Sequence, residues 1–374
     1  MEALRKAVET PLLPRTVDEE TRREEIGLAQ IRRAIPAAYF EPDARRSWGA
    51  LLRILGCMAL CLYGLSLVQP GSGAALWWQV PVLVALWVFY GWVLVGLFVI
   101  GHDCGHRSFA TRKWVNTLVG YFCMSPLANS FHSWRLTHDH HHAYTQLRGQ
   151  EVDWAAHLLT REEFAGLTSK EGFITRLGYL LPFGIVLWIA WNTLRRGIAI
   201  RTMLSARQWD REKRRLLLSN FLAGICMLSI YGGLWYFCGF WGMLKYHGIP
   251  ALVATLTGWL IIAIQHAGED GILYEESDWT PVRGQLVSTF DVRFPALLEY
   301  LWCAINFHIP HHVAAGIPWY HLKEAGRCLR QAYPGFYQEQ KFGLAHLRWF
   351  YRTPFLKKEA DKGYYVLDIS PGHP

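Results

Sequence analysis

The sequence predicts an all-α integral membrane protein, with four transmembrane helices in two hairpins and a helical cap on the cytosolic side. Three observations lead to this fold class. Long uncharged runs alternate with charged segments, the positive charges fall on one side of those runs, and the histidines gather in three clusters outside them. Apolar residues make up 52% of the 374 residues and charged residues only 18%, a composition that favours a membrane protein.

Four apolar runs have about the length needed to cross a bilayer, which takes roughly 20 residues. They are residues 48–68, 76–100, 218–243 and the shorter 250–264. The first run contains one charge, Arg53, near its start, where a long side chain can reach the interface. Short turns at residues 69–75 and 245–248 join the runs in pairs. We therefore expect two helical hairpins.

The Lys and Arg residues predict the orientation of these hairpins. Residues 1–47 contain nine, residues 101–215 contain sixteen and residues 266–374 contain eleven, whereas the two turns contain only Lys245. The positive-inside rule places the three basic segments in the cytoplasm. Topology and anionic lipid headgroups then account for the net charge of +8, and nucleic acid is not expected as a partner.

Two further apolar segments are expected to lie on the membrane surface. Residues 114–131 are interrupted by Pro126, and residues 174–194 are flanked by arginines. A fifth crossing by residues 174–194 would put histidine clusters on opposite sides of the membrane. The expected parts of the chain are an N-terminal cytosolic or interfacial segment at 1–47, hairpins at 48–100 and 216–265, and cap segments at 101–215 and 266–374, the last including the C-terminal tail.

Three histidine clusters indicate a metal site. The first has the spacing HxxxH and the other two have the spacing HxxHH. Their candidate ligands are His102 and His106, then His138, His141 and His142, and then His308, His311 and His312. Residues three and four apart share a helix face, so each cluster directs two or three imidazoles toward one point. Imidazole suits iron, copper, zinc and nickel, and an oxidisable metal acting on an apolar substrate is the chemistry to expect.

The residues around these clusters resemble the membrane fatty acid desaturases. The matching strings are Gly101-His-Asp-Cys-Gly-His-Arg-Ser-Phe109, Phe131-His-Ser-Trp-Arg135 with residues 138–142, and Asn306-Phe-His-Ile-Pro-His-His-Val313. The likeness covers roughly residues 40–325 and is greatest to bacterial and cyanobacterial acyl-lipid omega-6 (Delta-12) desaturases. It implies the mushroom-shaped fold of that family, in which four membrane helices lie below a cytosolic cap that holds a dimetal site.

The resemblance also implies a ninth ligand after the last span, a place that His266 occupies. Pro310 is tolerated only in the first turn of a helix, so we expect a helix to begin at His308 or Ile309. Metal-bound histidines usually donate their second ring nitrogen to a carboxylate or carbonyl group. The residues expected to support the ligands, or to have structural roles beside them, are Asp103, Asp139, Asp153, Glu269, Asp270, His132, His140 and Asn306.

The activity implied by the resemblance is oxygen-dependent removal of two vicinal hydrogens from the acyl chain of a membrane lipid, which leaves a cis double bond. Two Fe ions would be the cofactor, and O2 the co-substrate. The chain has no nicotinamide or flavin fingerprint, so a ferredoxin-like or cytochrome-type donor would supply the electrons. A bacterial inner or thylakoid-type membrane, with the active site on the cytosolic side, is the expected location.

Two alternatives stay open. An acyl hydroxylase or carotenoid ketolase of the same superfamily would share the metal site and differ in product. A metal-transport or haem-binding membrane protein belongs to a different class. Transporters place their ionisable ligands near the bilayer midplane, whereas these histidines lie at or beyond the ends of the apolar runs, which disfavours transport.

Overall fold

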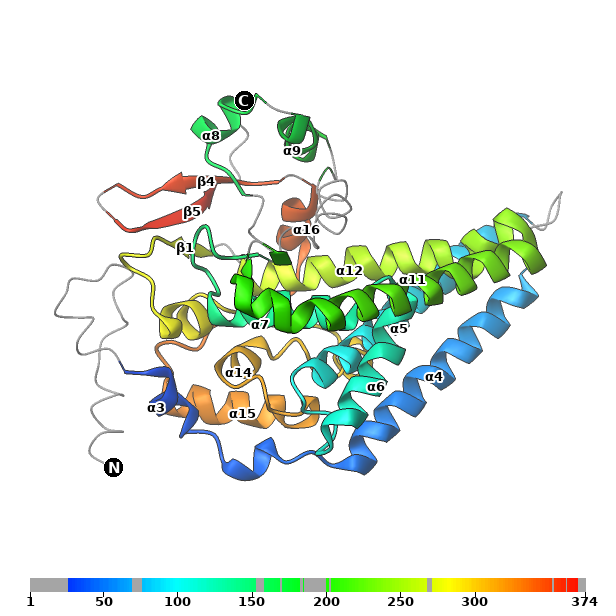
Figure 1. Ribbon diagram of the computed structural model, residues 1–374, viewed down its shortest axis with the longest axis horizontal. Helices are drawn as coiled ribbons and strands as arrows, with labels where there is room; N and C mark the ends of the chain where they lie inside the picture. Colours follow the sequence, from blue (N-terminus) through cyan, green and yellow to red (C-terminus); the bar gives the residue numbers. More distant parts are fainter. Residues whose placement is uncertain are drawn as a thin grey trace.

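The structure is a computed structural model that describes residues 26–68, 76–152, 158–168, 170–181, 184, 200–201, 203–267, 271–351, 353–360 and 362–368. Over these residues the fold is mostly helical, with a bundle of long helices extending from a cap of short helices and strands (Figure 1). The expectation of a purely helical chain is wrong in one respect, because the cap also contains two small sheets.

Three helical segments of the described chain are long and apolar enough to cross a membrane, namely Ala44–Leu67, Trp77–Gly105 and Ala206–His266. Helix α4 (Ala44–Leu67) begins at Asp43, whose carboxylate accepts the backbone N–H groups of Arg45 and Arg46. Helix α5 (Leu76–Gly105) packs against α4 and four other helices, most extensively against the helices at residues 113–124 and 249–266. This central position explains why its sequence is apolar on every side.

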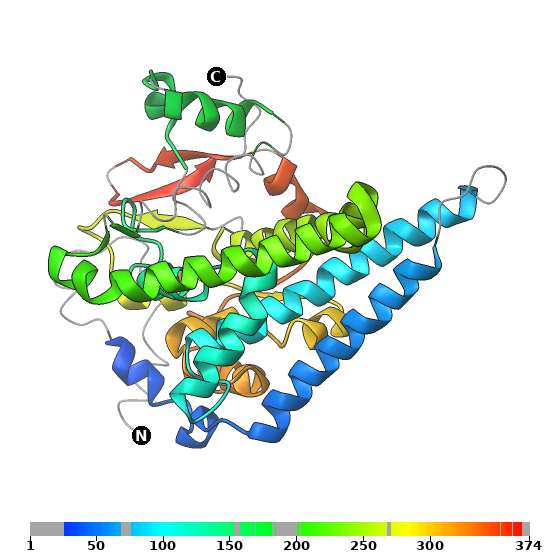
Figure 2. The same ribbon diagram turned by 45° about the vertical axis from the view of Figure 1, so that its right-hand side comes forward.

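The third segment folds back on itself. It consists of α11 (Ala206–Met243), the π-helical turn η3 (Leu244–Gly248) and α12 (Ile249–His266), and the two helices lie side by side in Figures 1 and 2. Gly239 has φ 69° and ψ −179°, a conformation that is essentially restricted to glycine. The rings of Tyr231 and His247, on either side of it, lie 5.2 Å apart. The turn predicted at residues 245–248 is therefore wrong, and the reversal lies at Gly239.

Two long basic side chains connect the hairpins and the cap. Lys245 is buried, and its ammonium group donates to the carbonyl of Val68 at the end of α4 (2.6 Å), which satisfies a helix-terminal acceptor. The carbonyl of Lys245 accepts the indole N–H of Trp87 on α5 (2.9 Å). Arg53 of α4 lies over the ring of Tyr300 at 3.8 Å and donates to its carbonyl (2.9 Å). Arg53 thus ties α4 to the cap.

Helices α6 (Lys113–Met124) and α7 (Phe131–Ala143) lead from α5 into the cap. The 3-10 turn η2 (Ser125–Leu127) ends α6 and contains Pro126, where the sequence predicted a break. Trp114, Leu118 and Phe122 form an exposed apolar stripe on α6, which is typical of a helix lying against lipid. The position of α6 on a membrane surface stays a prediction.

Two small sheets close the cap. Strands β1 (Ile272–Tyr274), β5 (Tyr364–Asp368) and β4 (Phe355–Lys358) form an antiparallel sheet in that order, and β2 (Asp291–Arg293) pairs in parallel with β3 (Glu339–Lys341). The C-terminal strands thus return beside the segment that follows His266. An isolated bridge also joins Tyr274 to Leu147, close after the second histidine cluster. Strands of three to five residues are too short for an alternating pattern to predict them.

Helix α9 (Lys170–Leu180) covers part of the segment predicted to lie on the membrane surface at residues 174–194, and most of the remainder is outside the described residues. Tyr179 of α9 stacks on Phe355 of β4 at 4.6 Å and also contacts Phe164 of α8 (Arg161–Ala165). The described part of this segment therefore packs on the cap. Its relation to a membrane stays a prediction.

The remaining helices surround the third histidine cluster. Helix α14 (His308–Val313) begins at His308 with Pro310 in its first turn, as predicted. It packs against α15 (Trp319–Ala332) and α3 (Leu28–Arg32) in one apolar cluster. The other short elements are η1 (Ala37–Phe40), η4 (Arg283–Val287), α13 (Ala296–Leu301) and α16 (Leu344–Tyr351).

We predict that Gly239→Ala lowers the melting temperature of the protein in detergent by about 1–4 °C, because a side chain at this φ and ψ costs about 1–3 kcal/mol in a chain of this length. Gly224→Ala is the matched control, since Gly224 lies within helical α11 and open space surrounds the position of an added Cβ. Alanine favours a helix, so the control should match or slightly exceed the wild type. Equal melting temperatures for the two variants would contradict the assignment of the reversal.

Candidate metal centre

The nine candidate histidines come together in the cap in two groups, although four helices supply them. In the first group the donor nitrogens lie within 4.8 Å of one another, and its members are His102, His106, His138, His142 and His311. The second group consists of His141, His266 and His312, together with His308. The Nε2 atom of His308 lies 3.0 Å from the Nε2 atoms of both His266 and His312.

Helical periodicity explains this division. On α7, His138 and His142 are four residues apart and share the face that points to the first group, whereas His141 points to the second. On α14 the pair four apart, His308 and His312, belongs to the second group, and His311 belongs to the first. Each HxxHH motif therefore supplies both groups. A shift of either helix would disturb both at once.

The spacing of the ring nitrogens fits shared metal ions. The Nε2 atom of His138 lies 3.1 Å from the Nε2 atoms of His102 and His142. Two imidazole nitrogens that each lie about 2.1 Å from one ion, at right angles, are about 3.0 Å apart. The Nε2 atoms of His106 and His311 are buried and have no hydrogen-bond partner among the described residues. Such atoms are costly to bury unless a ligand satisfies them.

Burial also keeps the rings in the form that binds metal. Loss of hydration lowers their pKa values well below the usual range for histidine, and the neighbouring imidazoles lower them further. This holds for the six candidate ligands that lie outside the apolar helices, which are His106, His138, His142, His308, His311 and His312. A protonated imidazole cannot ligate a metal. The site is thus prepared as a set of neutral nitrogen donors, which suits a transition metal such as iron.

Two carboxylates lie beside the second nitrogens of candidate ligand rings. Glu151 Oε1 lies 2.8 Å from His141 Nδ1, and both side chains are almost fully buried. Asp103, which was predicted, places Oδ1 3.4 Å from His102 Nδ1 and accepts the backbone N–H of Trp319 with Oδ2 (3.2 Å). A carboxylate in this position fixes the tautomer, so that the opposite nitrogen faces the metal.

Sequence reasoning missed Glu151 and pointed instead to Asp153, which lies outside the described residues, as do Glu269 and Asp270. Glu151 is ten residues from His141, in a loop, and no helical spacing relates the two. A signal was nevertheless present, since Glu151 is an acidic residue in the short stretch that follows the second cluster.

The other predicted supporting residues do not contact the ligand rings. Asp139 is exposed and lies 4.0 Å from Arg135. The Nε2 atom of His140 donates to the carbonyl of Gln150 (3.1 Å), and so supports the loop that carries Glu151. Asn306 is buried and donates to Glu299 (3.1 Å) just before the third cluster.

His132 is also not among the histidines of the two groups. Its Nε2 atom lies 2.9 Å from Glu212 Oε2, and its backbone N–H donates to Ser219 Oγ (2.9 Å). Both partners lie on α11, so His132 fastens α7 to the second hairpin. This is the structural role favoured by its spacing.

Buried polar side chains hold the ligand helices at their ends. Gln146 donates to the carbonyl of His266 (2.8 Å), and Gln285 donates to the carbonyl of His142 (2.7 Å). Asp291 accepts the backbone N–H of Ile309 (2.9 Å) and the hydroxyl of Tyr337. Burial raises the pKa of Asp291 to about 7. None of these residues lies in a histidine motif, and long-range packing alone brings them to the site.

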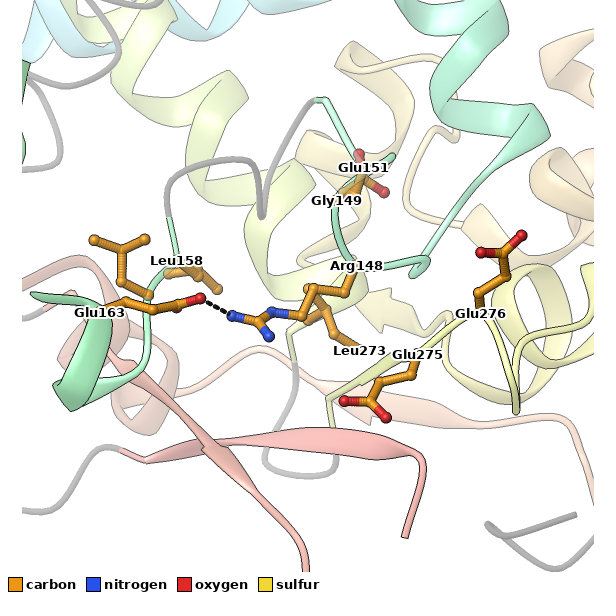
Figure 3. A pocket seen from close by; sticks show the side chains of 9 residues that line it. Arg148, Gly149, Glu151, Leu158, Glu163, Leu273, Glu275 and Glu276 are labelled. Carbon is orange, nitrogen blue, oxygen red and sulfur yellow. Dashed lines mark hydrogen bonds and ion pairs between the residues drawn. The ribbon is translucent and has the colours of Figure 1, made fainter.

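A cavity of about 490 Å³ lies beside Glu151 at the cap surface. Figure 3 shows Arg148 reaching across it to Glu163, at 2.6 Å, with Glu275 and Glu276 on the other side. Glu151 both lines this cavity and bonds to His141. At this cavity, the polar surface of the cap therefore lies close to the second histidine group.

Comparison with known proteins decides the family. The profile described as Fatty acid desaturase matches residues 75–343. The chain belongs to the fatty acid desaturase family. This desaturase is 31% identical over 322 residues to the sn-1 oleoyl-lipid 12-desaturase of Synechocystis sp., an alignment that covers 85% of each protein. It is 32% identical over 292 residues to the protein of the same name from Arthrospira platensis, covering 77% of each. It is therefore an oxidoreductase.

One further relative has a name that includes its electron donor. The sn-1 acyl-lipid omega-3 desaturase (ferredoxin) of Nostoc sp. is 26% identical to this desaturase over 354 residues, covering 93% of each protein.

We predict that Glu151→Ala lowers metal affinity by about 10–100-fold, the usual cost of losing a carboxylate behind a ligating histidine. Glu151→Gln keeps an acceptor oxygen for His141 and should lose less. The measurement is bound metal per chain after dialysis against graded chelator, with Asp139→Asn as the control because Asp139 is exposed and pairs with Arg135. Wild-type retention in Glu151→Ala would show that this carboxylate does not orient the ligand.

Proposed function

We propose that this desaturase introduces a cis double bond at the Delta-12 (omega-6) position of an oleoyl chain carried by a membrane glycerolipid. The observation that carries the proposal is the convergence of nine histidines, seven of them buried and two half-buried, in a chain of this family. The position of the double bond is inferred from the relatives of Synechocystis sp. and Arthrospira platensis, whose names specify 12-desaturation of oleoyl lipid.

We further propose that the nine histidines hold two iron ions, with five ligands from the first group and four from the second, and that O2 is the co-substrate. Bound there, iron would supply the oxidising power that an unactivated methylene pair requires. The chain's own part is to keep the imidazoles neutral, to orient them through Glu151 and Asp103, and to exclude water.

Aromatic packing next to the first group supports an apolar substrate. Trp134 stacks on His138 at 4.5 Å and lies 5.4 Å from His102, and Phe98 of α5 packs edge-on against the same indole at 5.6 Å. Trp134 is almost fully buried. These rings surround part of the metal site with hydrocarbon, which suits an acyl chain better than a polar substrate.

We infer that the chain crosses the membrane four times, with α11 and α12 as separate crossings. Support comes from the two ends of that segment, because Glu212 bonds to His132 and His266 joins the second group. Near the reversal, Trp235, Tyr236 and Phe237 are exposed, as expected of an aromatic belt at an interface. The distribution of Lys and Arg favours a cytosolic cap, in a bacterial inner or thylakoid-type membrane.

The electrons are proposed to come from a ferredoxin-like carrier, with a cytochrome-type carrier as the alternative. The name of the Nostoc relative favours the first. Each double bond formed would need two electrons from this donor.

The test is expression in cells whose lipids contain oleoyl chains but no polyunsaturated chains, followed by gas chromatography and mass spectrometry of the lipid acyl groups. We expect linoleoyl chains from the wild type and none from His266→Ala, which removes a ligand of the second group. His132→Ala should retain activity, because His132 contacts α11 rather than the metal groups.

Hydroxylated chains or oxidised carotenoids would instead favour another reaction of the same superfamily. Unchanged product from His266→Ala would remove His266 from the ligand set. Immunoblotting of the membrane fraction shows whether each variant accumulates to the same level.

A further inference from the structure

Helix α15 covers one side of the third histidine cluster. Its inner face packs on α14 through Leu322, Ala325 and Leu329. Gly326 packs closely on α14 and on Tyr337, since a Cβ there would lie 3.6 Å from Pro310 Cγ and would collide with the Tyr337 hydroxyl. Pro310 lies between His308 and His311, which belong to different metal groups. Helix α15 therefore lies directly on the helix that supplies ligands to both groups, and packed helices have axes about 8–10 Å apart.

The outer face of α15 is basic. Lys323, Arg327 and Arg330 are exposed at positions i, i+4 and i+7, which places them along one side of the helix. Glu324 pairs with Arg327 at 3.2 Å, and Glu339 pairs with Arg330. Arg33 is exposed at the end of α3, which also packs on α14. Four cations against two carboxylates leave the surface with a positive excess.

We propose that this basic face, formed by Arg33, Lys323, Arg327 and Arg330, is the docking surface for a small acidic one-electron carrier protein of the iron–sulfur type. The proposal rests on the proposed function, which requires an external donor. An acidic carrier would be drawn to a positive surface and oriented by it. It would then stand on the outer face of α15, the helix that packs on α14 and its histidines.

The number of electrons needed for each double bond fits two successive docking events of a one-electron carrier. Each reduced carrier loses one electron, so two carriers supply two electrons per double bond. The acyl chain supplies two more electrons with its two hydrogens, and solvent supplies two protons. One O2 accepts the four electrons and leaves as two molecules of water, and the C–C single bond becomes a double bond.

The experiment uses the full-length enzyme loaded with iron, in lipid nanodiscs that contain oleoyl phospholipid. Plant-type [2Fe–2S] ferredoxin, kept reduced by its reductase and NADPH, is the probe. We expect Lys323→Gln/Arg327→Gln to lower kcat/KM for ferredoxin by about tenfold at low ionic strength and to flatten its salt dependence. The matched control is Lys357→Gln/Lys362→Gln, which removes two exposed cations from the C-terminal strand hairpin, on the opposite side of the cap in Figure 1.

The outcomes separate the docking surface from the chemistry. The proposal is supported if kcat/KM falls only in Lys323→Gln/Arg327→Gln and if the iron content and melting temperature of this variant match the wild type. Equal kcat/KM and salt dependence in both double variants and the wild type overturn it, since the carrier then docks elsewhere. Absence of desaturated product from the wild type, with ferredoxin or with dithionite, would overturn the proposed function itself.

Discussion

The fold depends on one constraint, which is that nine imidazoles, seven of them buried and two half-buried, must be held close together, although buried ring nitrogens are costly unless a ligand satisfies them. Helix geometry meets part of this constraint, because residues three and four apart on α7 and α14 face two neighbouring points. The rest is met by long-range contacts. Gln146, Gln285 and Asp291 each bond to the backbone of a ligand-bearing helix from another part of the chain.

The cap architecture follows from the same constraint. The histidines lie at the ends of α5 and α12 and along α7 and α14. These four helices must meet, so the cap-side ends of both helical hairpins have to lie in one place. The reversal at Gly239 lets α12 run back along α5 and bring His266 to the second group. The C-terminal strands then cover the chain just beyond His266 through β1. A protein of this design has little freedom to move one ligand without moving several.

The sequence predicted the features that depend on local periodicity and composition. The apolar runs, the break at Pro126 and the start of α14 at His308 all follow from spacing, and the structure agrees with them. Features that depend on contacts between distant residues could not be predicted from local spacing and composition. Glu151 is reached through a loop, and the strands are too short to show a pattern. The reversal lies at Gly239, whereas residues 245–248 belong to the π-helical turn η3. The division of the histidines into five and four also requires the relative placement of four helices.

The central claim is that these two groups each hold one metal ion. The most direct measurement is the iron content of the purified protein after anaerobic reconstitution, made on the wild type and on His311→Ala and His312→Ala, which each remove a ligand from a different group. The account predicts about two irons per wild-type chain and a loss of iron in both variants. A wild-type chain that binds a single zinc ion, or no iron at all, would contradict it.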